Sequence, residues 1–294
     1  MNKVGFIGVG IMGKSMVRNL MKAGFELHIY ARTKSKVEDV ISEGAQFHES
    51  IKDCVQDCDA VITIVGFPQD VEEVYFDEGN ILDSAKKGAY LIDMTTTSPQ
   101  IAEKIYEEGT KRGFHVMDAP VTGGDTGAKA GTLSILVGGE KEDYEACMSL
   151  FEAMGTNINY QGKAGCGQHC KLANQIMIAG TLSGVCEALT YAKEQGLDPE
   201  VFMKSVATGA AGSKQLDTFG PKILKDDYAP GFFMKHFIKD MKLALIEANR
   251  KGLSLDVLSM VLANYEELEQ EGYGDLGTQA LMKFYDEEHR NMEE

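Results

Sequence analysis

The chain has 294 residues, 44% of them hydrophobic, and its 45 acidic and 29 basic residues give a formal net charge of −16. A chain of this length usually forms two domains, and this apolar content can fill their cores. The acidic balance argues against nucleic acid or an anionic membrane surface as a partner, but a locally basic pocket could still bind a small anionic substrate. A strand pattern begins at residue 3, so we expect no signal peptide. We also expect that no apolar run reaches transmembrane length. The sequence therefore predicts a cytosolic protein.

Six cysteines in a chain of this size do not predict a disulfide framework. Cys54 and Cys58 are four residues apart, as are Cys166 and Cys170, and His169 lies beside the second pair. A metal site formed by this second group is conceivable, but zinc sites usually have closer pairs and a second pair at a matching spacing. We therefore favour small reduced side chains and predict no metal.

A glycine motif of the form G-x-G-x-x-G follows an apolar run at residues 3–7 and precedes a helical pattern. In a strand–turn–helix unit the first glycine allows the tight turn, the second lets the backbone approach a pyrophosphate, and the third lets the helix pack close to the strand. The N–H groups at the start of such a helix face a negatively charged ligand. The sequence therefore predicts a dinucleotide site, and its expected contacts in this motif are Gly8, Gly10, Ile11, Met12 and Gly13.

The same glycine spacing recurs at Gly272, Gly274 and Gly277, near the other end of the chain. A helical stretch rich in Leu, Glu and Gln precedes this second match, and no strand pattern does. A glycine at a helix C-terminus followed by a turn explains it better than a phosphate loop.

Short apolar runs alternate with helical stretches from residue 1 to about residue 160. This alternation predicts βαβ units, a parallel sheet with right-handed crossovers, and ligands beyond the carboxyl ends of the strands. The expected strands are Lys3–Ile7, Glu26–Tyr30, Ala60–Val65, Tyr90–Asp93 and His115–Met117, with helices that include Lys34–Glu43 and Pro99–Arg112 and added edge strands at Leu133–Val137 and Ile158–Tyr160.

After Gly162 almost every segment has a helical pattern, beginning with one long helix over residues 171–194. We therefore predict an α/β fold class, with an N-terminal Rossmann-type doubly wound sheet and a C-terminal all-helical domain. The dinucleotide-binding domain is expected over residues 1–161. A helical substrate and dimerisation domain is expected over residues 162–294, joined to the first by a long helix that starts near residue 168.

The end of the second expected strand indicates which dinucleotide is bound. A NAD site usually has an Asp or Glu about twenty residues beyond the glycines, where it accepts a hydrogen bond from the ribose 2′-hydroxyl. This chain instead has Arg32, Thr33 and Lys36 there. Arginine can stack on and bond to a 2′-phosphate, Thr33 can donate its hydroxyl and the lysine adds positive charge. We therefore favour NADP over NAD, the alternative being a solvated basic start to a helix.

Three later segments combine polar side chains with expected strand ends or a helix start. Residues 93–99 (DMTTTSP) and 118–124 (DAPVTGG) each leave a strand, and the Thr-Gly-Gly turn of the second offers a hydroxyl and bare N–H groups to a carboxylate. Residues 162–175 cross from one expected domain into the other. On a helix, Lys171, Asn174 and Gln175 of this third segment share one face.

Together these segments resemble the β-hydroxyacid dehydrogenase family, which includes 3-hydroxyisobutyrate dehydrogenase, tartronate semialdehyde reductase and glyoxylate/succinic semialdehyde reductase. The similarity covers essentially the whole chain. It rests on GVGIMG, DMTTTSP, DAPVTGG, the G-x-x-G-x-G-x-x-x-K-x-x-N run at residues 162–174 and GFFMKHFIKD at residues 231–240. The resemblance implies an oxidoreductase that transfers hydride between NADP(H) and a small hydroxy acid or aldehyde acid.

The resemblance also assigns roles to residues. Lys171 would be the general acid/base, because a lysine whose pKa is lowered by burial and nearby positive charge can exchange a proton with a substrate oxygen while the nicotinamide delivers hydride. Thr122, Gly123 and Gly124 would hold the substrate carboxylate, with Thr in place of the usual Ser. The remaining expected substrate contacts are Asn174, Gln175, Phe232 and Asp240, and the remaining expected cofactor contacts are Val65, Gly66, Val71, Thr96 and Lys239.

Several alternatives stay open at this point. A NAD-dependent 3-hydroxyisobutyrate dehydrogenase is disfavoured by Arg32, and an imine reductase by Lys171, which those enzymes generally lack. A 6-phosphogluconate dehydrogenase would need a much longer helical domain. A non-catalytic NADP-sensing protein is the alternative from another class. We expect a small substrate that bears a carboxylate, and we expect the chain to form a homodimer or homotetramer.

Overall fold

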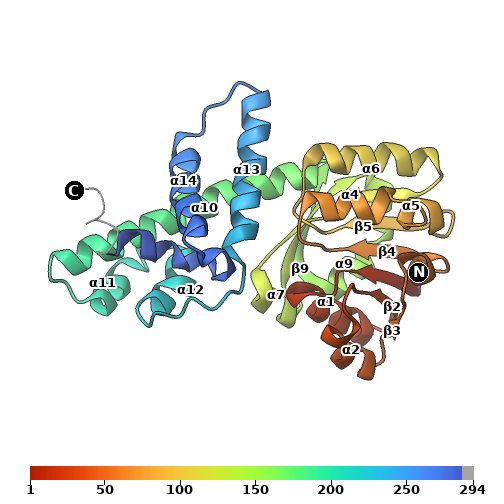
Figure 1. Ribbon diagram of the computed structural model, residues 1–294, viewed down its shortest axis with the longest axis horizontal. Coiled ribbons are helices and arrows are strands. Elements are labelled where there is room, and N and C mark those ends of the chain that lie inside the picture. The colour runs from red at the N-terminus through yellow and green to blue at the C-terminus, as the bar shows by residue number, and fades with distance from the viewer. Residues whose placement is uncertain (287–294) are drawn as a thin grey trace. The chain divides into compact units, whose positions relative to one another are not determined.

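The computed structural model describes residues 1–286, and the chain divides into two compact units, Met1–Lys171 and the part from Leu172 onward. The first unit contains a nine-stranded sheet with helices on both of its faces (Figure 1). Its strands are β1 (Lys3–Ile7), β2 (Glu26–Tyr30), β3 (Gln46–Phe47), β4 (Ala60–Thr63), β5 (Tyr90–Asp93), β6 (His115–Asp118), β7 (Val121–Thr122), β8 (Leu133–Gly139) and β9 (Gly155–Gly162). With the helical second unit described below, the predicted fold class is confirmed.

The strand order is β3-β2-β1-β4-β5-β6-β8-β7, and β9 pairs with β8. The strands from β3 through β6 are parallel, with Ile7 opposite both Tyr30 and Thr63. The chain leaves β1 toward β2 and β3 and then crosses to β4 on the other side of β1. In a doubly wound sheet this reversal creates the ligand-binding crevice, at the carboxyl ends of β1 and β4.

Alternating apolar side chains explain why helices cover both faces of this sheet. Val4 and Phe6 of β1 lie in one core cluster, whereas Ile7 lies in another with Val61 of β4. The first cluster is completed by α1 (Ile11–Lys22), α2 (Glu38–Ser42), α7 (Gly124–Ala130) and α9 (Met148–Met154). The second is completed by α3 (Ile51–Val55), α4 (Pro68–Phe76), α5 (Ile81–Ser84) and α6 (Pro99–Lys111). The short η1 (Lys34–Lys36) and α8 (Lys141–Ala146) complete the unit.

Some local predictions were wrong. The helix expected over residues 34–43 is divided into η1 and α2, because the buried Val37 between them leaves helical geometry at φ −123°. The segment expected as an edge strand at residues 133–137 is the longer β8, which is internal because it pairs with β6, β7 and β9. The two-residue strands β3 and β7 were not predicted, since two residues carry no periodic signal.

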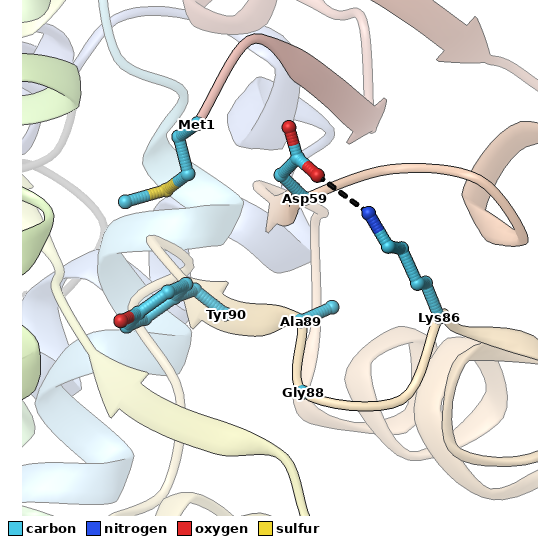
Figure 2. A pocket seen from close by; sticks show the side chains of 6 residues that line it. All are labelled: Met1, Asp59, Lys86, Gly88, Ala89 and Tyr90. Carbon is cyan, nitrogen blue, oxygen red and sulfur yellow. Dashed lines mark hydrogen bonds and ion pairs between the residues drawn. The ribbon is translucent and has the colours of Figure 1, made fainter.

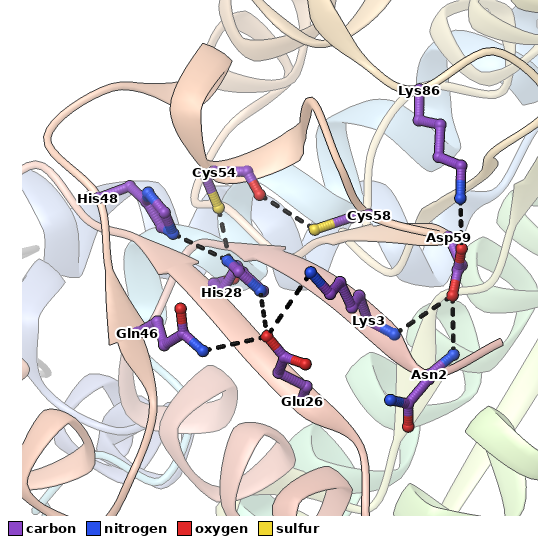
Figure 3. Close-up of polar contacts among 10 residues, drawn as sticks. All are labelled: Asn2, Lys3, Glu26, His28, Gln46, His48, Cys54, Cys58, Asp59 and Lys86. Atoms are coloured by element: carbon purple, nitrogen blue, oxygen red, sulfur yellow. Dashed lines mark hydrogen bonds and ion pairs between the residues drawn. The ribbon is translucent and has the colours of Figure 1, made fainter.

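A polar network fixes the amino-terminal edge of the sheet (Figure 3). The Asp59 carboxylate, just before β4, accepts the backbone N–H groups of Asn2 (2.9 Å) and Lys3 (3.3 Å) at the start of β1. It also forms an ion pair with Lys86 (2.7 Å). These contacts, that with Lys86 foremost, hold the pKa of Asp59 well below its usual range. The network therefore ties the start of β1 to the segments before β4 and β5.

The second unit is helical (Figure 1). It contains most of α10 (Cys166–Glu194), followed by α11 (Pro199–Val206), α12 (Lys214–Ile223), α13 (Met234–Arg250), α14 (Asp256–Gln270), η2 (Tyr273–Asp275) and η3 (Thr278–Tyr285). In its core Phe237 meets the Tyr265 ring edge-on at 5.4 Å, and the Tyr265 hydroxyl donates to the carbonyl of Thr278 (2.7 Å). Gly272 adopts φ 92° just after α14, so the second glycine motif is a helix end and a turn, as predicted.

The helix α10 is the one described helix that is long and apolar enough to cross a membrane, with 29 residues and a mean hydropathy of 1.2 over an 18-residue stretch. The expectation that no apolar run reaches this length was therefore wrong. Core helices meet the same criteria, and Ala179, Leu182 and Leu189 of α10 are buried in the core of the second unit.

The division between the units falls within α10, after Lys171. The sequence pattern placed it near residue 161, where β9 ends. The first turns of α10 belong to the first unit because Asp118 and Gln168 bind them to it, through contacts described below.

Candidate active site

The glycine loop between β1 and α1 is shaped by close backbone contacts. Gly8 has φ 98°, and a Cβ atom there would lie 2.1 Å from the carbonyl oxygen of Ile64. A Cβ atom on Gly13 would lie 2.2 Å from the carbonyl oxygen of Gly8. A Cβ atom on Gly10 would have no heavy atom within 4 Å. Gly8 and Gly13 are therefore required by the fold, whereas Gly10 leaves open space, which suits the close approach of a pyrophosphate.

Basic and hydroxyl side chains follow β2, at the carboxyl end of the sheet. Arg32, Thr33 and Lys36 are all exposed. The Arg32 guanidinium lies 3.2 Å from a carboxylate oxygen of Asp70 in the first turn of α4, and the Arg32 side chain is 74% exposed. The sequence did not predict this neighbour, because Asp70 is distant in the chain and belongs to another element.

Two large apolar side chains near the same loops are exposed. Ile11 in the first turn of α1 is 47% exposed, and Phe67 after β4 is 37% exposed. A nucleotide bound at these strand ends would cover such surfaces. Val65, before Phe67, donates its N–H to the hydroxyl of Thr95 (3.0 Å), whereas Val71 is completely buried in the core. Phe67 had no signal in the sequence.

The carboxyl end of β5 carries a buried carboxylate, that of Asp93. Its Oδ1 atom accepts hydrogen bonds from the Thr63 hydroxyl (2.8 Å) and from the backbone N–H of Thr95 (3.1 Å). Burial raises the pKa of Asp93 to about 6, although hydrogen bonds from Thr95 and Thr63 oppose this effect, and the charge of Asp118 adds to it. Two carboxylates therefore lie buried under this edge of the sheet.

The start of α10 is held by the second of these carboxylates. Asp118, at the end of β6, accepts the N–H of Gly165 on Oδ1 (2.7 Å) and that of Gln168 on Oδ2 (2.8 Å). These are N–H groups that a helix cannot satisfy internally, so Asp118 serves as a non-local cap. Burial raises the pKa of Asp118, and the two backbone hydrogen bonds act in the opposite direction.

The side chain of Gln168 binds the segment after β5. Its Oε1 accepts the N–H of Thr97 (3.0 Å), and its Nε2 donates to the carbonyl of Thr95 (2.7 Å). Thr96, an expected cofactor contact, lies between these two residues. Lys171 follows one turn later in α10 and is 7% exposed. The sequence placed Lys171 correctly on a helix but had no signal for Gln168.

The predicted carboxylate cradle forms a turn that only glycine can make easily. Thr122 ends β7, where it pairs with Ser134, and α7 begins at Gly124. Gly123 has φ 129° and Gly124 has φ 63°, both in the region that disfavours side chains. Next to Thr122, the backbone N–H groups of Gly123 and Gly124 therefore have no side chain of their own to cover them.

In the second unit, four of the predicted residues form one chain of contacts. Asn174 donates to the Oε1 of Gln175 (2.7 Å), and the Nε2 of Gln175 donates to Asp240 (2.8 Å). The other Asp240 oxygen lies 3.0 Å from the Nζ of Lys239. Phe232 is half-buried and packs against the rings of His236 and Phe237. Gln175 and Asp240 are almost fully buried, at 1% and 0% exposed, and each has both of its side-chain polar atoms in one of these contacts.

A pocket at the other edge of the first unit does not contribute to this site. It is lined by residues before β4 and at the start of β5, including Asp59, Lys86 and Tyr90 (Figure 2). These are amino-terminal strand ends, opposite the edge where doubly wound sheets bind ligands. Within residues 1–286, no group of three or more His, Cys, Asp and Glu side chains could hold a metal ion, and all six cysteines are free.

Two family models match the chain in succession. The model described as the NAD binding domain of 6-phosphogluconate dehydrogenase matches residues 3–162. The model described as the NAD-binding of NADP-dependent 3-hydroxyisobutyrate dehydrogenase matches residues 165–285. The glycine loop and these matches define the class of protein, a NAD(P)-dependent oxidoreductase with a dinucleotide-binding domain and a helical domain.

Individual relatives narrow this class. The chain is 49% identical over 282 residues to an uncharacterized oxidoreductase of Bacillus subtilis, covering 96% of this chain and 98% of the relative. It is 44% identical over 281 residues to a probable mitochondrial 3-hydroxyisobutyrate dehydrogenase-like protein of Arabidopsis thaliana, covering 95% and 84%. The structure of Mycobacterium tuberculosis 3-hydroxyisobutyrate dehydrogenase with L-serine matches with a TM-score of 0.87 at 26% identity, covering 96% and 98%. The chain belongs to the β-hydroxyacid dehydrogenase family and is a NAD(P)-dependent hydroxyacid dehydrogenase, so the predicted family and enzyme class are confirmed.

Alanine substitutions in the glycine loop should separate folding from cofactor binding. Gly13→Ala forces a methyl group against the Gly8 carbonyl and should lower the free energy of unfolding by about 1–3 kcal/mol. Gly10→Ala meets no protein atom, so it should leave the unfolding midpoint nearly unchanged. It should nevertheless raise the Kd for NADPH by about tenfold or more, because the methyl group occupies space needed by the pyrophosphate. Urea unfolding and NADPH titration measure both effects, and unimpaired NADPH binding by Gly10→Ala would contradict this role.

Replacing Asp93 by Asn should change how stability depends on pH. The pKa of Asp93 in the folded state, about 6, exceeds the ordinary value of 3.8. Between these two pH values the folded state therefore binds more protons than the unfolded state. As a result, wild type loses stability as the pH rises through this range. The variant still offers an acceptor to Thr63 and Thr95 but cannot ionise. Its free energy of unfolding, relative to wild type, should therefore rise by about 2–3 kcal/mol between about pH 4 and pH 7.5.

The matched control for this experiment is Asp57→Asn, since Asp57 is exposed in the same unit. Urea unfolding of wild type and both variants at the two pH values gives the comparison. A stability difference between Asp93→Asn and wild type that does not vary with pH would contradict the pKa assigned to Asp93.

Proposed function

We propose that the protein reduces a small aldehyde acid with NADPH, and oxidises the corresponding hydroxy acid in reverse, with Lys171 as general acid/base. The observation that carries this proposal is the position of Lys171. It is 7% exposed, and it lies in the first turns of a helix whose start is bound to the carboxyl ends of β5 and β6. That is the edge at which a doubly wound sheet binds its ligand. In reduction, hydride passes to the aldehyde carbon and the Lys171 ammonium gives its proton to the oxygen.

The Thr122-Gly123-Gly124 turn is the proposed site for the substrate carboxylate. Its bare N–H groups and hydroxyl are suitable donors for an anion, and its left-handed glycines keep side chains out of the way. Asn174, Phe232 and Asp240 remain proposed substrate contacts. Because both ends of the Gln175 amide are bonded, to Asn174 and Asp240, we assign Gln175 the role of orienting these two side chains.

The cofactor preference is proposed to be NADP over NAD. Arg32, Thr33 and Lys36 follow β2, at the position where a NAD site usually has a carboxylate. The nearby Asp70 pairs with Arg32 through one carboxylate oxygen and accepts the N–H of Phe67 on the other, so both of its oxygens already have partners. Thr96 and Lys239 are the proposed contacts near the nicotinamide.

The helical unit is also the proposed surface for self-association into a homodimer or homotetramer. Its large apolar side chains include Met177, Val257 and Met260, which are 74%, 59% and 51% exposed. We propose these side chains as the apolar part of that interface. A cytosolic location stays a prediction.

Substitution of Lys171 by Ala tests the proposed chemistry. Wild type should reduce at least one of glyoxylate, succinic semialdehyde, tartronate semialdehyde and methylmalonate semialdehyde, faster with NADPH than with NADH. Lys171→Ala should lose about 10³-fold or more in kcat, since the proton donor is gone, while its Kd for NADPH changes by no more than about threefold. Initial rates with the four aldehyde acids and fluorescence titration with NADPH measure both quantities.

Lys193→Ala is the matched control, because Lys193 is exposed near the other end of the same helix. It should retain wild-type rates. A Lys171→Ala enzyme that remains substantially active would remove the mechanism. Failure of wild type to consume NADPH with any of the four acids, together with tight NADPH binding, would favour a cofactor-sensing protein without turnover.

Reversing the charge at Arg32 tests the cofactor preference. Arg32→Asp should lower the ratio of kcat/KM with NADPH to that with NADH by at least about tenfold, because the variant repels a 2′-phosphate and can accept from a ribose hydroxyl. The control is Arg112→Asp, which makes the same charge change in the same unit and also breaks an arginine–aspartate pair, that with Asp83. An unchanged ratio in Arg32→Asp would show that these basic residues do not select the cofactor.

A further inference from the structure

Both polar atoms of the Gln168 side chain form hydrogen bonds with backbone groups. It is completely buried, its Oε1 accepts the N–H of Thr97 at 3.0 Å, and its Nε2 donates to the carbonyl of Thr95 at 2.7 Å. The amide thus pairs with both sides of Thr96 as a neighbouring strand would. If they were left unpaired, these buried backbone groups would destabilise the fold, because burial removes their hydrogen bonds to water.

The segment that Gln168 holds is itself attached to the sheet. The Thr95 hydroxyl accepts the N–H of Val65 (3.0 Å), after β4, and the Thr95 N–H donates to Asp93 at the end of β5 (3.1 Å). Residues 95–97 are therefore fixed to the carboxyl ends of β4 and β5, where the proposed nicotinamide contact Thr96 lies.

The other end of the connection, the start of α10, is equally constrained. Asp118 accepts the N–H groups of Gly165 and Gln168, as described above. A Cβ atom on Gly167 would lie 2.4 Å from the carbonyl oxygen of Leu136, and one on Gly138 would lie 2.8 Å from the backbone nitrogen of Gly167. The helix start therefore sits directly on the backbone of the sheet, without intervening side chains that could adjust.

Lys171 is three residues after Gln168, so the two side chains are neighbours on the helix surface. We propose that Gln168 is a positioning residue: its amide sets the distance between the Lys171 ammonium and residues 95–97, and hence between proton donor and nicotinamide. This inference rests on the proposed function of Lys171 as general acid/base. Gln168 itself touches neither substrate nor reacting atoms, and acts through Lys171.

Two variants of Gln168 separate this role from simple packing. Gln168→Met keeps the length and volume of the side chain but removes both hydrogen bonds. Gln168→Glu keeps an acceptor for the Thr97 N–H. When ionised, its carboxylate cannot donate to the Thr95 carbonyl, but when protonated it can. Gln195→Met is the matched control, since Gln195 is exposed just beyond the other end of α10.

The experiment measures kcat, KM and the pH profile of kcat for these variants, with NADPH and the fastest of the four aldehyde acids, together with the NADPH Kd and the unfolding midpoint. Gln168→Met should fold and bind NADPH within about threefold of wild type but lose about 10- to 100-fold in kcat, because a displacement of about 1 Å at a reacting group costs about that much. Its pH profile should also shift, since Lys171 changes its surroundings. Gln168→Glu should recover kcat toward wild type as pH falls, whereas Gln168→Met should not.

Wild-type kcat and an unshifted pH profile in Gln168→Met would overturn the positioning role. A loss of kcat in both variants that only follows lost NADPH binding or unfolding would overturn it too, in favour of a structural role. If Gln168→Met does not fold, the pH-dependent recovery of Gln168→Glu decides, and its absence overturns the proposal. Lys171→Ala separates failure of the proposed function from failure of this inference. An active Lys171→Ala enzyme would contradict both. An inactive Lys171→Ala enzyme, together with wild-type activity in Gln168→Met, would contradict only the positioning role.

Discussion

The hydrogen bonds from the start of α10 to the Asp118 carboxylate are the interaction on which the described site depends. A helix start needs acceptors for its first N–H groups, and here they come from the end of β6 instead of from a neighbouring residue in the chain. This makes the first turns of α10 part of the first unit. As a result, Lys171 has a defined position relative to the carboxyl ends of the strands, and this position does not depend on the part of α10 that belongs to the second unit.

Burying two carboxylates at the carboxyl ends of β5 and β6 lowers the stability of the fold. Asp93 and Asp118 are both buried, both have a raised pKa, and the charge of Asp118 adds to the cost of ionising Asp93. Buried charges of this kind persist when hydrogen bonds offset the desolvation, as the Thr63, Thr95, Gly165 and Gln168 donors do here. The edge of the sheet at which we propose the chemistry is therefore also the edge where polar groups replace apolar packing.

Glycines allow close backbone contact at two places where a helix meets the sheet. Gly8 and Gly13 bring strand and helix into contact around the nucleotide loop, and Gly138 and Gly167 do the same where α10 meets the sheet. In both places the backbone approaches to distances that exclude a Cβ atom, so neither junction can shift without loss of packing. Two rigid junctions at one edge suit the proposed transfer of hydride and a proton to a small substrate, because the reacting groups must be held within a fraction of an ångström.

The sequence by itself determined the nucleotide loop, the parallel sheet, the helical second unit and the family, because periodicity and glycine spacing are local properties that survive without knowledge of packing. It also placed Lys171, Asn174 and Gln175 on a helix. Only the tertiary structure decided that Gln168 binds Thr95, that Asp118 caps α10 and that Asp70 pairs with Arg32. The partners of the first two contacts are 73 and 50 residues apart in the chain, and such contacts follow from how strand ends converge, which no single segment encodes.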